Sequence, residues 1–157
     1  MSLQHPLFPE PQTLIPQAPP FLFVDKILNC TEQALEAQYL WKEDEYFFKG
    51  HFPGNPIVPG VILCEMLLQC GALWTALANE KSVYSHTTPV VTRIQEAKFK
   101  SIVRPGDHCI GKIELVEKMG DVVFFKGKMM VQEKVCLTLQ FTVAQVNQQL
   151  NQQVNQN

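Results

Sequence analysis

The sequence has almost no excess of charge of either sign. It contains 13 Lys and Arg against 15 Asp and Glu, a formal net charge of -2 at pH 7. Proteins that bind nucleic acid through general electrostatics need a basic excess, so the composition gives no case for a nucleic-acid partner. The remaining composition, 46% hydrophobic and 18% charged, is ordinary for a soluble globular protein. For a chain of 157 residues we expect one domain with a real hydrophobic core.

The cysteine patterns that hold metals or disulfide frameworks are also missing. The five cysteines form an odd set with no C-x-x-C pair and no histidine cluster beside them, whereas zinc sites and disulfide scaffolds use regular spacings. Residues 1–6 contain neither a basic region nor an apolar run, so no signal peptide is expected. We therefore expect no bound metal, and a reduced, cytoplasmic protein with buried thiols at Cys30, Cys64, Cys70, Cys109 and Cys136.

Proline is scarce after the first 20 residues, which hold six of the eleven prolines. A segment so rich in proline cannot form a regular helix or a central strand, so residues 1–20 are interpreted as a lead-in arm. Residues 147–157 are Asn and Gln apart from Leu150 and Val154. Such a segment has too few apolar groups to pack and is expected to be a disordered tail. We therefore expect a single domain over residues 1–146.

One long run without proline stands in the middle of the chain, at residues 61–78. Its only ionisable side chains are those of Glu65 and two cysteines, and its richness in Leu, Ala and Met predicts a helix. Apolar residues lie on all sides of this helix, so we expect it to be buried all round. The run is long enough to span a membrane, but Glu65, Gln69 and Gly71 within it and the lack of basic flanks favour a core helix. No membrane insertion is expected.

Six strand-like segments accompany this helix. The last of them has the clearest period-2 alternation, typical of a strand with one buried face, and Met119-Gly120-Asp121 is typical of a hairpin turn. Two strands, one helix and four strands in meander order predict an α+β fold, a curved antiparallel sheet wrapped around the single helix. One sheet leaves part of the helix and its own edges uncovered, which favours a dimer. The expected strands are residues 21–28, 34–41, 90–100, 109–117, 122–132 and 134–144.

A turn-rich loop runs into the helix and carries groups that predict chemistry. Histidine suits proton abstraction near neutral pH, and the loop holds His51. Glu65, about one turn inside the apolar helix, should have a raised pKa, which suits a general acid. Pro59-Gly60 places the helix start here, so the N–H groups of Gly60 and Val61 are expected to be unpaired donors for an oxygen that gains negative charge. Together these groups describe proton abstraction beside a carbonyl, with loss of a β-hydroxyl.

These residues belong to a longer motif, His51-Phe52-Pro53-Gly54-x-Pro56-x-x-Pro59-Gly60-Val61-x-x-x-Glu65-x-x-x-Gln69. The motif resembles the signature of the (3R)-hydroxyacyl-[acyl carrier protein] dehydratases of bacterial type II fatty acid synthesis, the FabZ type. The resemblance extends to the segments at residues 20–25, 97–100 and 104–107, and it covers the chain from about residue 14 to residue 144. Relatives that also isomerise the product carry Asp in place of Glu65, so the resemblance is to the plain dehydratase.

The resemblance implies a hot-dog fold, with active sites at a dimer interface where His51 of one subunit meets Glu65 of the other, and often three such dimers in a hexamer. It implies the reversible dehydration of (3R)-3-hydroxyacyl thioesters to trans-2-enoyl thioesters, in fatty acid synthesis or in a related lipid, aryl-polyene or polyketide pathway. Acyl carrier protein carries the substrate on its phosphopantetheine arm, and no cofactor beyond that is expected.

Further residues near the motif have candidate roles. Gln69 lies one turn after Glu65 on the same helix face, where it either orients or closes the site or simply packs. Three basic residues either form a rim for an acidic carrier protein or are scattered solvated charges: Lys98, Lys100 and Arg104. The candidates for lining an acyl tunnel are Phe48, Phe52, Ile57, Ile62 and Phe99.

Two other functions on the same fold stay open. A hot-dog acyl thioesterase would use a carboxylate to activate water or to attack the thioester, and the complete motif argues against it. A non-catalytic acyl-binding subunit would be expected to have lost His51 or Glu65, and both are present.

Overall fold

The computed structural model describes residues 7–79 and 87–147. In these ranges the chain forms one α-helix, six β-strands and a short 3-10 helix, η1. In chain order the elements are η1 (Pro11–Thr13), β1 (Lys26–Cys30), β2 (Ala34–Leu40), α1 (Gly60–Ala78), β3 (Thr87–Phe99), β4 (His108–Met119), β5 (Val122–Val131) and β6 (Lys134–Asn147).

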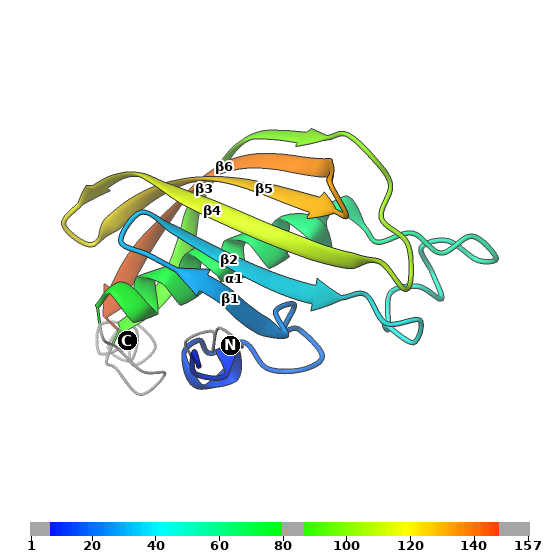
Figure 1. The fold of residues 1–157 in the computed structure, drawn as a ribbon, viewed down its shortest axis with the longest axis horizontal. Helices are drawn as coiled ribbons and strands as arrows, with labels where there is room; N and C mark the ends of the chain where they lie inside the picture. The colour runs from blue at the N-terminus through cyan, green and yellow to red at the C-terminus, as the bar shows by residue number, and fades with distance from the viewer. Residues whose placement is uncertain (1–6, 80–86, 148–157) are drawn as a thin grey trace, which may run out of the picture.

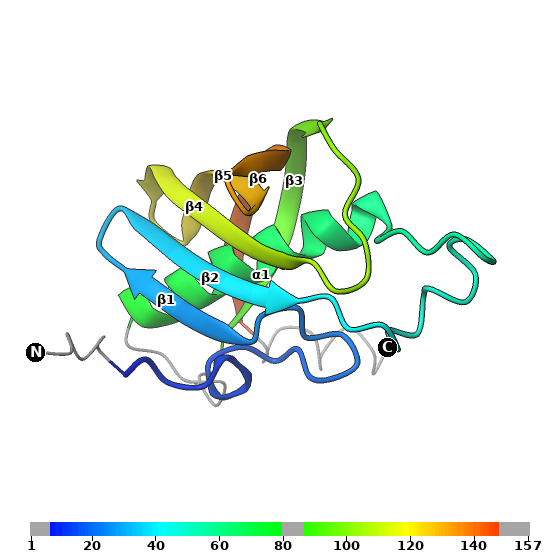
Figure 2. The same ribbon diagram turned by 45° about the vertical axis from the view of Figure 1, so that its right-hand side comes forward.

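All six strands pair antiparallel in one sheet, in the order β1-β2-β4-β5-β6-β3. The sheet curves around α1, which runs along its concave face (Figure 1). Turning the molecule by 45° shows the same helix held between the β1–β2 side and the β3–β6 side of the sheet (Figure 2). This is the α+β arrangement that the sequence predicts, a curved antiparallel sheet wrapped around one long helix.

The expected meander order of the last four strands is wrong for β3. Strands β4, β5 and β6 follow one another as predicted, but β3 pairs with β6 and lies at the far edge of the sheet. A strand has two edges, and those of β4 are filled by β2 and by β5. The connection from β3 to β4 instead passes the start of α1, where Val58 donates its N–H to the carbonyl of Val103 over 2.9 Å.

The first strand is shorter than predicted, because it begins at Lys26 and not at Phe21. The backbone before it pairs with a side chain and not with a strand: Phe23 donates its N–H to Gln69 Oε1 over 2.8 Å, and the carbonyl of Phe21 accepts from Gln69 Nε2 over 2.9 Å. At the other end of the chain, β6 reaches Asn147, the first residue of the expected tail. The rest of that tail, residues 148–157, lies outside the described residues.

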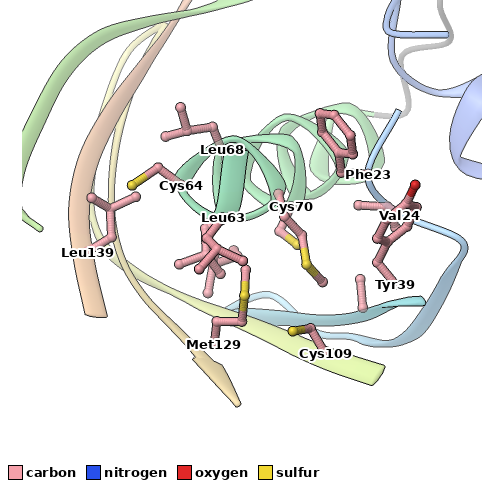
Figure 3. Packing of buried hydrophobic residues seen from close by; sticks show 14 of the residues in the cluster. Phe23, Val24, Tyr39, Leu63, Cys64, Leu68, Cys70, Cys109, Met129 and Leu139 are labelled. Carbon is pink, nitrogen blue, oxygen red and sulfur yellow. The ribbon is translucent and has the colours of Figure 1, made fainter. Parts of the chain in front are cut away.

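The core lies between α1 and the concave face of the sheet. Leu139, Met129 and Cys109, from β6, β5 and β4, face the helix, which contributes Leu63 and Cys70 (Figure 3). Each of these five side chains is at most 3% exposed. Full burial of a large apolar side chain is worth roughly 1.5–3 kcal/mol, so this layer contributes substantially to holding the helix in place.

Glycine stands where helix and sheet approach most closely. A Cβ atom at Gly71 of α1 would lie 2.6 Å from Cε2 of Phe141 on β6, and one at Gly111 of β4 would lie 3.2 Å from Cδ2 of Leu67. A larger residue at Gly71 would force the helix or the Phe141 ring to shift, and one at Gly111 would require the neighbouring side chains to give way by a few tenths of an ångström. The close approach of helix and sheet therefore depends on the absence of a side chain at these two positions.

Helix α1 alone among the described residues is long and apolar enough to cross a membrane, and 72% of its most apolar window is buried inside the protein. The expectation of burial all round holds for residues 63–76 apart from Glu65. It is wrong at both ends, where Val61 is 74% exposed and Ala78 is exposed, because a single sheet does not cover the ends of the helix.

We predict that Gly71→Ala destabilises the protein. The new methyl group would also lie 2.9 Å from Cζ of Phe141, a ring that is 2% exposed and has little room to move. Overpacking of this kind costs up to about 3 kcal/mol, which exceeds the gain of about 1 kcal/mol in helix propensity. Thermal or urea unfolding should show a net loss of about 2 kcal/mol.

The matched control is Gly50→Ala, because a Cβ at Gly50 would meet nothing within 4 Å. It should leave the free energy of unfolding unchanged within about 0.5 kcal/mol. Equal stability of the Gly71→Ala variant and the wild-type protein would show that helix and sheet can separate at this contact without cost.

Candidate active site

His51 is held in place by its own loop, residues 41–59, which projects beyond the sheet at the end where α1 begins (Figure 1). Its N–H donates to the carbonyl of Phe47 over 3.0 Å, and its carbonyl accepts from the N–H of Ile57 over 2.9 Å. Its Nδ1 lies 3.0 Å from the carbonyl oxygen of Ile57. A carbonyl can only accept, so Nδ1 carries the hydrogen in this contact and Nε2 keeps a free lone pair. That tautomer is the one a general base requires.

The His51 ring is also fixed from one side. The Phe52 ring stacks on it, with 4.1 Å between the ring centroids and 24° between the planes. Phe52 itself is 47% exposed, so the pair lies at the surface of the single chain. A hydrogen bond at one nitrogen and a stacked ring on one face leave the Nε2 edge of His51 as its open side.

The start of α1 presents two free donors. Pro59 precedes the helix, and its carbonyl accepts the N–H groups of Ile62 and Leu63 over 2.9 and 3.1 Å. In the described part of the chain, the N–H groups of Gly60 and Val61 have no hydrogen-bond acceptor. They stand at the positive end of the helix dipole. The geometry thus fits the predicted role of these donors, holding an oxygen that gains negative charge.

Gly60 also brings an aromatic ring against the helix start. A Cβ at Gly60 would lie 2.8 Å from Cε1 of Phe99, so the ring of this β3 residue packs where any other residue would place a methyl group. Phe99 is nevertheless 54% exposed. Its ring therefore forms one open wall beside the two backbone donors.

Glu65 lies one turn further along α1 and is partly buried. Burial raises the pKa of its carboxyl group, and a hydrogen bond from Gln69 lowers it by a smaller amount. The donor is Gln69 Nε2, 3.0 Å from Glu65 Oε1. A carboxyl group with a raised pKa stays protonated to higher pH than an exposed one, as a general acid requires.

Gln69 is completely buried and uses both ends of its amide. Besides Glu65 it bonds to the backbone of Phe21 and Phe23. Sequence reasoning identified Gln69 but missed these two partners. Both partners are backbone groups, which are the same in almost every residue, so the residue types could not predict these contacts.

The predicted tunnel residues differ in burial and fall into three groups. Phe48 is 6% exposed and packs on Phe47, with 4.8 Å between the ring centroids. Ile57 and Ile62 are partly buried, while Phe52 and Phe99 are exposed, as described above. In the single chain Phe99 and Ile62 therefore lie at the helix start, while Phe52 and Phe99 remain open to solvent.

The predicted basic rim lies next to the same place. Lys98 and Lys100 flank Phe99 in the sequence, and both are exposed. Lys98 forms an exposed ion pair with Glu96, 3.3 Å between Nζ and Oε2. The guanidinium of Arg104 donates to Oδ1 of Asn55 over 3.1 Å, which ties it to the His51 loop.

A single chain does not bring the proposed base and acid into contact. Among the described residues no ion pair joins His51 to Glu65, and the contacts of the His51 ring and of the Glu65 carboxyl group are those given above.

The described residues also contain no group of three or more His, Cys, Asp or Glu side chains that could hold a metal ion. The cysteines are all free, four of them buried and Cys30 partly exposed.

Comparisons with known proteins place this arrangement in a family. The model of the FabA-like domain matches residues 15–140. The chain is 35% identical over 130 residues to the 3-hydroxyacyl-[acyl-carrier-protein] dehydratase FabZ of Petrotoga mobilis, covering 83% of this chain and 91% of that protein. It is 36% identical over 126 residues to the FabZ dehydratase of Clostridium perfringens, covering 80% and 88%.

Solved structures agree on the fold. The dehydratase heterocomplex ApeI:P from Xenorhabdus doucetiae superposes with a TM-score of 0.81 at 14% identity, covering 96% of this chain and 99% of that chain. A thioesterase from Haemophilus influenzae gives a TM-score of 0.58 at 17% identity, covering 78% of each chain. The expected hot-dog fold is therefore confirmed, and the chain belongs to the FabA-like family of hot-dog dehydratases.

Proposed function

We propose that the protein catalyses the reversible dehydration of (3R)-3-hydroxyacyl thioesters on acyl carrier protein to trans-2-enoyl thioesters, in fatty acid or related acyl-chain biosynthesis. The observation that carries the proposal is the fixed tautomer of His51, whose Nδ1 donates to the Ile57 carbonyl over 3.0 Å. The free Nε2 then serves as the base, and the start of α1 supplies two free N–H donors. FabZ dehydratases about 35% identical to this chain support the same reaction.

Each group has one task in the reaction. His51 Nε2 takes the proton from the carbon next to the thioester carbonyl. The N–H groups of Gly60 and Val61 hold the carbonyl oxygen as it gains negative charge. Glu65 gives its proton to the hydroxyl group on C3, the C–O bond breaks and water leaves, so the electron pair of the broken C–H bond becomes the new double bond. The thioester supplies the acidity of the C–H bond, and no metal or redox cofactor enters the scheme.

The active site in this proposal is shared between two subunits. Strand β3 is an edge strand, and its exposed side chains include Val91, Ile94 and Phe99, which are 40%, 51% and 54% exposed. Unpaired edges with apolar side chains favour pairing with a second strand. A dimer formed along β3 would cover these residues and the exposed Val61. It would also bring His51 of one protomer to Glu65 of the other, a contact that the single chain lacks.

The carrier protein is proposed to dock on the predicted rim. Lys98 and Lys100 flank Phe99, whose ring packs against Gly60 at the helix start, and Arg104 is bonded to Asn55 of the His51 loop. An acidic partner would approach this rim favourably, and its acyl chain would enter between Phe99 and the His51 loop.

A thioesterase is the second candidate on this fold. The Haemophilus influenzae structure above has the same fold as this chain. A hypothetical thioesterase from Streptococcus pneumoniae also has it, with a TM-score of 0.60 at 12% identity. At these identities the similarity supports the fold alone. A non-catalytic acyl-binding subunit is the third candidate. Such a subunit would need neither the fixed tautomer of His51 nor a half-buried carboxyl group at Glu65.

We predict that His51→Ala and Glu65→Gln each lower the dehydration rate on the order of 10²- to 10⁴-fold, the usual contribution of a general base or acid. The assay follows (3R)-hydroxyacyl carrier proteins of graded chain length by mass spectrometry, where dehydration appears as loss of water. The controls are His108→Ala and Glu117→Gln, two exposed residues that should leave the rate unchanged. Release of free acid by the wild-type protein would mean a thioesterase, and binding of every substrate without turnover would mean an acyl-binding subunit.

We also predict that the two inactive variants restore each other when they are expressed together. A mixed dimer has one site with both defects and one intact site, and random assembly makes half of all dimers mixed, so about a quarter of the sites should be active. The matched control combines His51→Ala with the His51→Ala, Glu65→Gln double variant, which builds no intact site in either geometry. Recovery no higher than this control would place both groups in one chain and contradict the shared site.

A further inference from the structure

The amide of Gln69 is held from three sides. Nε2 donates to the carbonyl of Phe21 over 2.9 Å and to Glu65 Oε1 over 3.0 Å, while Oε1 of Gln69 accepts the N–H of Phe23 over 2.8 Å. A primary amide has two N–H donors, and both are used here. The side chain is completely buried, so water does not replace any of these partners.

The backbone decides which way this amide points. Turning it over would place the NH₂ group against the N–H of Phe23 and the amide oxygen against the carbonyl of Phe21. Both contacts would then join like groups, and buried polar groups without partners are costly. With the observed orientation, the atom that faces Glu65 is always a donor. Oε1 of Glu65 is therefore always an acceptor.

The segment that imposes this orientation is itself fixed. Phe23 is buried, and its ring lies 5.7 Å from that of Trp41 and 6.4 Å from that of Phe47, centroid to centroid. Two residues later, the N–H of Asp25 donates to the carbonyl of Gln38 on β2 over 2.9 Å. The segment from Phe21 to Phe23 is thus anchored to the sheet, and its position relative to α1 is fixed.

We propose that residues 21–23, acting through Gln69, determine which oxygen of Glu65 carries the acid proton. Because Oε1 accepts the Gln69 N–H, the proton resides on Oε2, and Oε2 is the atom that delivers it to the departing hydroxyl group. Gln69 is then a positioning residue, and the segment before β1 is part of the catalytic apparatus. This inference rests on the proposed function, since it assigns the donor atom of the same general acid.

The groups that set the protonation of Glu65 are few. Within the described residues no charged side chain shifts its pKa, which burial raises and the Gln69 hydrogen bond lowers. In the proposed dimer the facing titratable group is His51 of the partner subunit. Loss of the Gln69 donor should therefore raise the pKa of Glu65. The high-pH limb of the rate profile, where Glu65 loses its proton, should move to higher pH.

The test compares Gln69→Met with the wild-type protein in the dehydration assay. Methionine keeps the length and removes all three hydrogen bonds. We expect kcat to fall on the order of tenfold to a hundredfold, as for the loss of one hydrogen bond to an ionisable group, with KM unchanged within about twofold. The high-pH limb should shift upwards at the same time. The stability-matched control is Gly71→Ala, which loosens the same helix without touching the amide and should keep the wild-type pH profile.

Two results would overturn the inference. One is a Gln69→Met variant whose kcat and pH limb equal those of the wild type. The other is a loss of activity equal to that of Gly71→Ala at equal stability, with no shift of the limb, which would assign Gln69 a structural role only. Either result leaves the proposed function intact if the wild-type protein dehydrates its substrate. Failure of the wild type to do so would instead reject the proposed function before any variant is compared.

A second measurement needs neither turnover nor a folded Gln69 variant. In nitrogen-15 NMR spectra of the wild-type protein, the side-chain NH₂ signal of Gln69 should shift with pH as Glu65 titrates, and this shift should vanish in Glu65→Gln. A Gln69 signal that ignores the titration would show that its amide does not face the carboxyl group in solution, and the inference would fall.

Discussion

The whole fold depends on burying one long apolar helix with a single sheet. Helix α1 is apolar on every side, so the hydrophobic effect drives the sheet to wrap around it. Glycines at positions 71 and 111 let the two layers approach. The burial of the helix is incomplete, because an open sheet with two free edges cannot surround α1 on all sides. The parts that it leaves open include the first turn of α1 and the edge strand β3.

The candidate site occupies this uncovered place, and the same physics accounts for its chemistry. The open helix start offers N–H donors that a buried start would have to pair. One turn deeper, the apolar surroundings raise the pKa of Glu65, so the residue that costs most to bury is also the one suited to donate a proton. Gln69 satisfies the hydrogen-bonding groups that remain. Its amide bonds to the Glu65 carboxyl group and to the backbone of Phe21 and Phe23, which is not paired with a strand.

Local signals in the sequence predicted the helix, and they are also the basis of the candidate site residues. The expected helix at residues 61–78 matches Gly60–Ala78, because a run of apolar residues after Pro59-Gly60 is a local pattern. The order of β4, β5 and β6 followed from the sequence, but the place of β3 did not, because the partner of β3 depends on which sheet edges other strands have filled. The segment from Phe21 to Phe23 has the apolar residues of a strand, but its hydrogen bonds go to Gln69 far along the chain. Nothing local records such a contact.

The most direct test of the central claim runs the reaction backwards in deuterated water. Trans-2-enoyl carrier protein is incubated with the enzyme, and the product is analysed by mass spectrometry. The account predicts a (3R)-3-hydroxyacyl thioester with one deuterium on C2, because His51 returns a solvent-derived proton to that carbon and Glu65 delivers water to C3. Release of a free acyl chain, or an enoyl thioester that stays unchanged, would contradict it.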